Sequence, residues 1–191
     1  MAHIPIPGVW VGATVRLERS EWTIMETINH CEFPCSRAEA ARLETRPFTC
    51  ARFRVRRTDN DTKAFMRVYR QIPIAGTEND SPAQRARQAI SDDHVEPAAL
   101  EKSTNRRLKC TPALLDRKLD RQDQSGYVPG EYHTTIVWST LPGIRLGDVF
   151  GPDTFWSMPR EERDLIRAEF RTNIMFVSDV LNHDLPYHFV D

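Results

Sequence analysis

The sequence predicts an α+β protein, in which an antiparallel sheet with a helix is followed by one long helix. Residues 50–56 alternate between small or apolar and charged side chains, the period-two pattern of a half-buried strand. Residues 132–138 are rich in β-branched and aromatic side chains, which favour strands. Residues 159–181 carry apolar side chains three or four positions apart, which is the spacing of an amphipathic helix.

The first 49 residues are the least patterned part of the chain, and we treat them as a poorly defined extension. Residues 14–18 alternate like a short strand. Residues 37–43 are expected to begin a helix, because Ser36 can cap it while Glu39 completes a capping box.

A β-hairpin is predicted between residues 50 and 69, with turn-forming residues at 58–61. The two faces of its first strand differ in character, with Ala51, Phe53 and Val55 on one side and Arg52, Arg54 and Arg56 on the other. The arginine face has two interpretations: a solvated strand face, or a cationic face that meets phosphates, which the planar guanidinium binds well.

Two helices are expected after this hairpin. Ser81 followed by Pro82 fits a helix start, and it predicts a short helix over residues 83–90. A second helix is expected from about residue 95 to residue 107, with Pro97 in its first turn.

A second hairpin is predicted beyond these helices. Residues 111–115 are strand-like, residues 120–130 form a polar turn, and residues 132–138 return as a strand. Leu141-Pro142-Gly143 then ends the strand sharply.

The helix predicted over residues 159–181 is the best-defined element. Glutamates follow Pro159 in its first turn, where the helix dipole favours negative charge. Its apolar stripe consists of Ile166, Phe170, Ile174, Val177 and Leu181. An exposed stripe of this length promotes association. We therefore expect it to pack on the rest of the chain, on a second copy in a homo-oligomer, or on a partner protein.

The overall composition excludes several classes of protein. The chain has 191 residues, of which 40% are hydrophobic and 28% charged, and its formal net charge is −1. This balance provides no electrostatic attraction to nucleic acid or to an anionic membrane. The sequence shows neither a signal peptide nor an apolar run near the roughly 20 residues of a membrane span. We expect a cytoplasmic protein that binds neither nucleic acid nor membrane.

The cysteines raise the question of a zinc site. His30, Cys31, Cys35 and Cys50 form a loose cluster, but only Cys31 and Cys35 are close enough to be a ligand pair. A zinc site normally combines two such pairs. We therefore expect no metal site, and buried thiols that are not linked to one another.

Four groups of residues occur in an order that suggests a known family: 64–73, 110–115, 126–143, and 155–167. They resemble a fungal protein-kinase-like family related to aminoglycoside phosphotransferases. The resemblance covers about residues 50 to 181. It implies a kinase-like small lobe over residues 1–140, followed by a hinge and part of a helical large lobe over residues 141–191.

The resemblance also implies a nucleotide site. In kinase-like folds a basic residue on the third strand holds nucleotide phosphates and pairs with a helix glutamate. Arg67 stands nearest that position, with Glu96 as its partner or Glu101 in another register. Trp138 to Leu141 would form the hinge strand that meets an adenine, although Trp138 equally fits a packing residue. The implied cofactor is ATP with Mg²⁺.

The chain departs from this family where phosphoryl transfer takes place. We identify no glycine-rich phosphate loop, because Gly8 and Gly12 are isolated. A catalytic loop of this kind needs an Asp and, a few residues later, a metal-binding Asn. After residue 181, Asp184 stands near the first of these positions and no Asn follows it. Asp184 is thus the candidate catalytic residue, and we expect a truncated or catalytically impaired homologue, a pseudokinase that binds ATP.

Three functions remain open at this point. The first is the kinase-like protein just described. The second is a non-enzymatic interaction or regulatory module that uses helix 159–181 to bind a partner or to self-associate. The third is a small enzyme of different chemistry, with His183 and Asp184, or His133, as its acid–base group.

Overall fold

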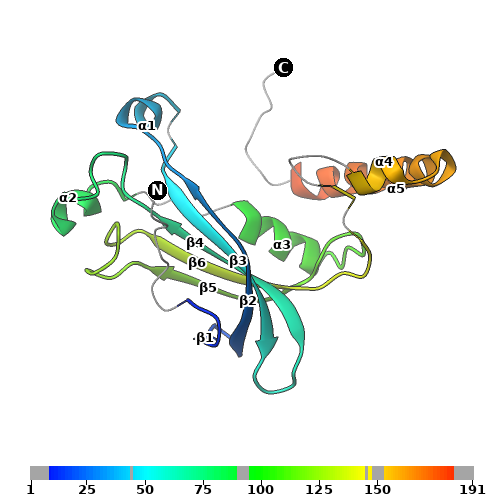
Figure 1. Cartoon of the computed structure of the whole chain (residues 1–191), viewed down its shortest axis with the longest axis horizontal. Helices are drawn as coiled ribbons and strands as arrows, with labels where there is room; N and C mark the ends of the chain where they lie inside the picture. Colours follow the sequence, from blue (N-terminus) through cyan, green and yellow to red (C-terminus); the bar gives the residue numbers. More distant parts are fainter. Residues whose placement is uncertain (1–8, 44, 90–94, 145, 148–152, 183–191) are drawn as a thin grey trace. The chain divides into compact units, whose positions relative to one another are not determined.

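The computed structural model describes residues 9–43, 45–89, 95–144, 146–147 and 153–182, and for residues 175–182 it describes the backbone alone. Within this part the chain is α+β, as predicted, with a six-stranded curled antiparallel sheet and five helices (Figure 1). Two compact units can be distinguished: residues 1–97 with 114–140, and residues 98–113 with 141–191. The second unit thus takes in residues 98–113, which the predicted small lobe includes.

The sheet belongs to the first unit, and its strands follow the order β1-β2-β3-β4-β6-β5. All neighbouring strands are antiparallel. The strands are β1 (Thr14–Arg16), β2 (Glu21–Phe33), β3 (Phe48–Arg57), β4 (Lys63–Gln71), β5 (Leu114–Arg121) and β6 (Tyr132–Ser139).

The predicted hairpin of β3 and β4 is confirmed, and its alternation decides which face is buried. Ala51, Phe53 and Val55 are at most 3% exposed, and they lie opposite Val68, Met66 and Ala64 of β4, which are equally buried. Because opposite residues of antiparallel strands share a face, these positions together form the centre of the apolar core. Arg52, Arg54 and Arg56 of β3 are on the other face.

Strand β2 was not predicted, and its burial explains why. It runs for 13 residues beside β3, with two irregularities in the register. Only Trp22 and Ile24, each 1% exposed, are buried along it. The remaining residues are half-buried or exposed and mostly polar, so the apolar alternation that identifies a strand is absent over most of its length.

Strand β5 begins later and runs further than predicted. The strand-like run 111–115 contributes only its last two residues, and the strand continues through the charged segment 116–121. The predicted polar turn therefore starts at Gln122 rather than at residue 120. The charges misled the prediction because β5 is an edge strand, on which charged side chains are well tolerated.

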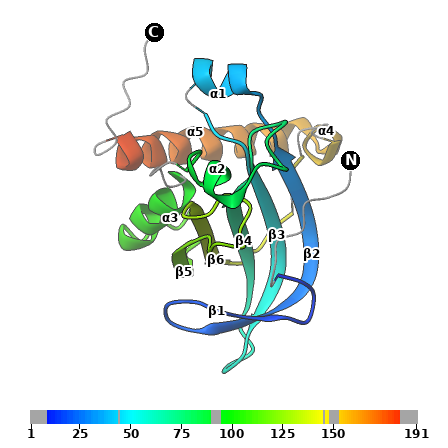
Figure 2. The ribbon, with the colours of Figure 1, turned by 90° about the vertical axis from the view of Figure 1, so that its left-hand side faces the viewer.

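The sheet curls until the turn between β1 and β2 reaches β5. The carboxylate of Asp116 accepts hydrogen bonds from the Arg19 N–H at 3.2 Å and from the Ser20 hydroxyl at 2.5 Å. The Glu18 N–H also donates to the carbonyl of Arg117. Figure 2 shows β1 lying across one end of the sheet. The apolar core is enclosed by this curl, on the face of Phe53.

The helices of the described residues are α1 (Arg37–Leu43), α2 (Pro82–Ala86), α3 (Val95–Asn105), α4 (Asp153–Ser157) and α5 (Arg160–Asn182). The capping box of α1 is present, since the Ser36 N–H donates to the Glu39 carboxylate at 2.8 Å and the Ser36 hydroxyl accepts from the Glu39 N–H. Helix α2 is shorter than predicted. None of these helices combines the length and the apolar character needed to cross a lipid bilayer.

Candidate functional site

The predicted site residue Arg67 lies on β4, between the neighbouring strands β3 and β6. Its neighbours in sequence, Met66 and Val68, point into the core and are fully buried. Strand alternation therefore directs Arg67 to the opposite face of the sheet, which is also the face of Arg52, its partner in register on β3. Arg67 therefore projects from an interior strand, which is hydrogen-bonded to a neighbouring strand on each side.

Glu96, in the first turn of α3, forms an ion pair with Arg67. The Nη1 atom of Arg67 donates to both carboxylate oxygens of Glu96, at 2.7 Å and 2.6 Å. The same nitrogen contacts the Tyr69 hydroxyl at 3.1 Å, and this hydroxyl in turn donates to Glu96. The carboxylate therefore joins two side chains that project from the same face of β4.

Electrostatics keep this cluster in one protonation state. Burial acts to lower the pKa of Arg67, but the hydrogen bond with Tyr69 and the charge of Glu96 outweigh it and raise the pKa above its usual value. Burial, and then the hydrogen bond to Glu96, raises the pKa of the Tyr69 hydroxyl. Arg67 is consequently cationic and Tyr69 neutral throughout the physiological pH range.

Trp138 of β6 completes the cluster on one side. The guanidinium of Arg67 lies over the indole ring, 5.3 Å from its centroid, within the range of a cation–π contact. The Phe65 ring also packs against this indole, with centroids 6.1 Å apart. Trp138 is only 9% exposed, so its packing role is evident from the structure. Contact with an adenine stays a prediction.

Of the predicted site residues, the structure brings together Arg67, Glu96 and Trp138. The partner of Arg67 is Glu96 rather than Glu101, which resolves the register that the sequence left open. Leu141 is 50% exposed and belongs to the second unit. Asp184 lies outside the described residues.

Comparison of the chain with protein-family models, with curated proteins and with solved structures finds no match.

The cysteines differ in part from the expectation. All four are free thiols, but only Cys35 is buried, whereas Cys31 and Cys110 are exposed and Cys50 is intermediate. Burial raises the pKa of the Cys50 thiol to about 11. Among the residues that the structure describes, no group of three or more His, Cys, Asp or Glu side chains is arranged to hold a metal ion.

Sequence reasoning missed Tyr69, which forms part of the cluster. Its position in the sequence could have identified it. Tyr69 is two residues after Arg67 on the same strand, and residues two apart on a strand point to the same face of the sheet. His133, named as an acid–base candidate, lies on the other face, where burial and the nearby positive charge of Arg70 lower its pKa to about 4. His133 is therefore neutral at pH 7.

Proposed function

We propose that this protein binds a nucleoside triphosphate through Arg67, in the manner of a kinase-like small lobe. The observation that carries the proposal is the ion pair between Arg67, on an interior strand, and Glu96, on α3, the second helix after that strand. A basic group held in this way by a helix glutamate is the arrangement with which protein kinases position nucleotide phosphates. The proposal concerns binding, since Asp184 is outside the described residues.

The unused edge of the Arg67 guanidinium is the part that would meet a phosphate. Its hydrogen bonds among the described residues all run from Nη1. Glu96 and Tyr69 therefore fix the orientation of the planar head group, and Nη2 is left to donate to an oxyanion. The side chains of Arg67 and Glu96 are 24% and 30% exposed, so a ligand can reach them from solvent.

In this proposal Mg²⁺ is bound by the phosphates of the nucleotide. The described residues contain no group of three or more His, Cys, Asp or Glu side chains that could hold a metal ion. We therefore assign Mg²⁺ no ligand from the described part of the protein. Arg67 contributes the positive charge, and Glu96 and Tyr69 fix its orientation. The nearly buried Trp138 ring packs against one face of the guanidinium.

Thermal unfolding with and without ATP and Mg²⁺ tests this proposal. Ligand at about 100 times its dissociation constant stabilises a folded protein by about 2.7 kcal/mol. We expect such a shift for the wild type and its loss in Arg67→Ala. Arg54→Ala is the matched control, because Arg54 occupies the same face of the neighbouring strand but is exposed and pairs with Glu26 at 2.8 Å. An equal shift in the wild type and Arg67→Ala, or no shift with ATP, would refute the proposal.

The exposed face of α5 favours a second function, self-association of the chain. Phe170 and Ile174, four residues apart and therefore on the same face of this helix, are 64% and 44% exposed. Apolar side chains of this size on one helix are typical of an association surface. Light scattering over a hundredfold range of protein concentration would reveal a dimer, and Phe170→Glu should return it to the monomer. A protein that is monomeric throughout this range would exclude self-association.

A further inference from the structure

A row of polar side chains crosses the sheet on the face opposite to the Arg67 cluster. Successive neighbours in register, from β2 to β5, are Glu32, Thr49, Arg70, His133 and Asp120. The adjacent positions on the same face, such as Val68, belong to the apolar core. The enclosed face of the sheet therefore changes from apolar to polar at this row, and its centre is a buried arginine.

Arg70 is buried without acceptors for two of its nitrogens. The residue is 7% exposed, and its Nε and Nη1 atoms have no hydrogen-bond partner among the described residues. Its guanidinium lies over the ring of Tyr127, 5.7 Å from the centroid. The face of an aromatic ring is a much weaker acceptor of hydrogen bonds than an oxygen atom. Burial of an unpaired guanidinium is costly, because nothing replaces the water that it loses. A bound oxyanion would supply the missing charge.

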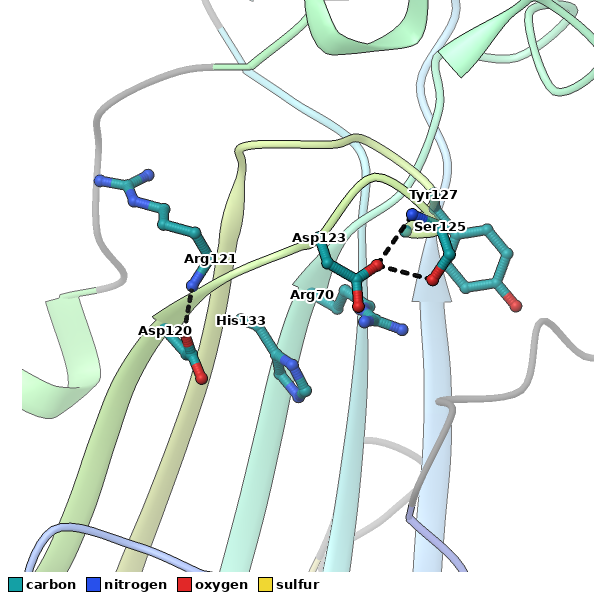
Figure 3. Close-up of a pocket in the computed structure, with 8 residues that line it drawn as sticks. Arg70, Asp120, Arg121, Asp123, Ser125, Tyr127 and His133 are labelled. Carbon is teal, nitrogen blue, oxygen red and sulfur yellow. Dashed lines mark hydrogen bonds between the residues drawn. The ribbon is translucent and has the colours of Figure 1, made fainter.

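A cavity of about 470 Å³ lies beside this guanidinium, lined among others by His133, Tyr127 and Ser125. Figure 3 shows the head group of Arg70 near the Asp123 carboxylate and the Tyr127 ring, with His133 on the neighbouring strand. This volume falls within the range of sites for small molecules.

The carboxylates at the cavity already have partners. Asp123 accepts hydrogen bonds from the N–H and the hydroxyl of Ser125, at 2.8 Å and 2.6 Å. Asp120 pairs with Lys118 at 2.9 Å and also accepts from the Arg121 N–H. Arg70, by contrast, forms no ion pair among the described residues, so it is the group that an anionic ligand would satisfy.

The loop that carries Ser125 and Tyr127 is held in place by Gln122. The buried side chain of Gln122 donates to the carbonyl of Gln71 at 2.9 Å and accepts from the Val128 N–H at 3.2 Å. Gly126 passes so close that a Cβ there would lie 2.7 Å from the Cβ of Gln122. The walls of the cavity are therefore formed before any ligand arrives, which lowers the entropic cost of binding.

We propose that this cavity binds a small molecule with one carboxylate or phosphate group, which pairs with Arg70. The nearby carboxylates of Asp120 and Asp123 repel a polyanion and favour a ligand that also carries hydroxyl or ammonium donors. Ser125 and the imidazole of His133 provide further hydrogen-bonding groups beside the anion. Hydroxy acids, amino acids and monophosphate esters of small polyols share this chemistry. The site is independent of nucleotide binding at Arg67, since the two lie on opposite faces of the sheet.

Titration of isotope-labelled protein with inorganic phosphate, glycerol 3-phosphate and lactate, each at constant ionic strength, tests the proposal by NMR. We expect saturable shifts of the Tyr127 amide and the His133 ring with at least one probe, and the phosphate and carboxylate probes distinguish the two oxyanions. Arg70→Gln should weaken binding about tenfold or more, because it removes a charge-assisted hydrogen bond. Arg54→Gln, on the other face of the sheet, should leave binding unchanged.

Asp123→Asn gives a second test if Arg70→Gln fails to fold. Removal of this carboxylate next to Arg70 should strengthen oxyanion binding several-fold, whereas Asp59→Asn, at an exposed ion pair with Arg57, should not. A weak site has a roughly millimolar dissociation constant. The proposal is overturned if no probe, at a concentration about 20 to 50 times that value, shifts the signals of the Tyr127 amide and the His133 ring. It is also overturned if Arg70→Gln binds as the wild type does, or if Asp123→Asn and Asp59→Asn behave alike.

Discussion

Replacement of Asp116 by alanine should destabilise the sheet by about 3 kcal/mol, through loss of the contact that closes its curl. Asp116 is 2% exposed, and its carboxylate accepts from the Arg19 N–H and the Ser20 hydroxyl across the edge of the sheet. A hydrogen bond to a charged group contributes about 1.5 to 3 kcal/mol. We take the lower value for each of the two donors that lie across the edge, since both contacts are only partly buried, and we add nothing for the third donor, the adjacent Arg117 N–H.

Urea denaturation followed by circular dichroism measures this loss of unfolding free energy. For a chain of this size it corresponds to a fall of about 6 to 12 °C in melting temperature. Asp120→Ala is the matched control, because Asp120 is exposed on the same face of β5 and its ion pair with Lys118 is worth at most about 1 kcal/mol. Hydrogen exchange of the Arg19 amide should also become faster in Asp116→Ala.

The double variant Asp116→Ala with Ser20→Ala separates the contact from general disruption. The two substitutions should be less costly together than the sum of their separate effects, because they remove the same hydrogen bond. If Asp116→Ala costs no more than Asp120→Ala, the curl is not held by this carboxylate and our interpretation of the sheet is wrong.

Three further results are expected. Oxidised glutathione should join Cys31 to Cys50, which lie directly opposite each other on β2 and β3, and peptide mapping should find the other two cysteines unlinked to them. Phe53→Ala should lower the unfolding free energy by about 3 to 5 kcal/mol, because this ring is 3% exposed, whereas Phe33→Ala should cost less, since Phe33 is 50% exposed. The pKa of His133 is about 4 in the folded protein but about 6.5 when unfolded, so the unfolded state gains a proton first. Stability present above pH 6.5 should be lost as the pH falls toward 4, more steeply than in His133→Gln, by at most about 1.4 kcal/mol per pH unit in urea titrations.

Each of these results has a contrary outcome that decides against the structure. A Cys31 cross-link to another cysteine would contradict the register of β2 and β3. Equal costs for Phe53→Ala and Phe33→Ala would mean that the core is not on the enclosed face. Parallel pH profiles for the wild type and His133→Gln would place this imidazole in water.

The local elements were largely predictable because their signals are local. The hairpin of β3 and β4 follows from strict alternation, α5 from its apolar spacing, and the cap of α1 from Ser36 and Glu39. Strand β2 and the charged half of β5 were missed, because neither shows an apolar alternation. Their strand conformation depends on backbone pairing with a neighbour, which leaves no periodic trace in the side chains.

The candidate site was only partly predictable for a similar reason. The resemblance to kinase-like proteins suggested that Arg67 pairs with Glu96, and the alternation of β4 directs Tyr69 to the same face. No local pattern indicates that Arg70 faces His133, because the two residues meet only through the pairing of β4 with β6. Their cluster became visible once the register of four strands was known.

The sequence by itself determined the α+β class, the two faces of β3 and the capped starts of α1 and α2, since these depend on neighbours within a few residues. Only the tertiary structure decided the strand order, the curl and the environments of the arginines. Asp116 and Arg19, which close the curl, are 97 residues apart. Arg54, Arg67 and Arg70 carry the same head group in three environments. Arg54 pairs with Glu26 in solvent, and Arg67 pairs with Glu96 in a half-buried cluster. Arg70 is buried, and its Nε and Nη1 atoms have no acceptor among the described residues, because long-range strand pairing sets what surrounds each arginine.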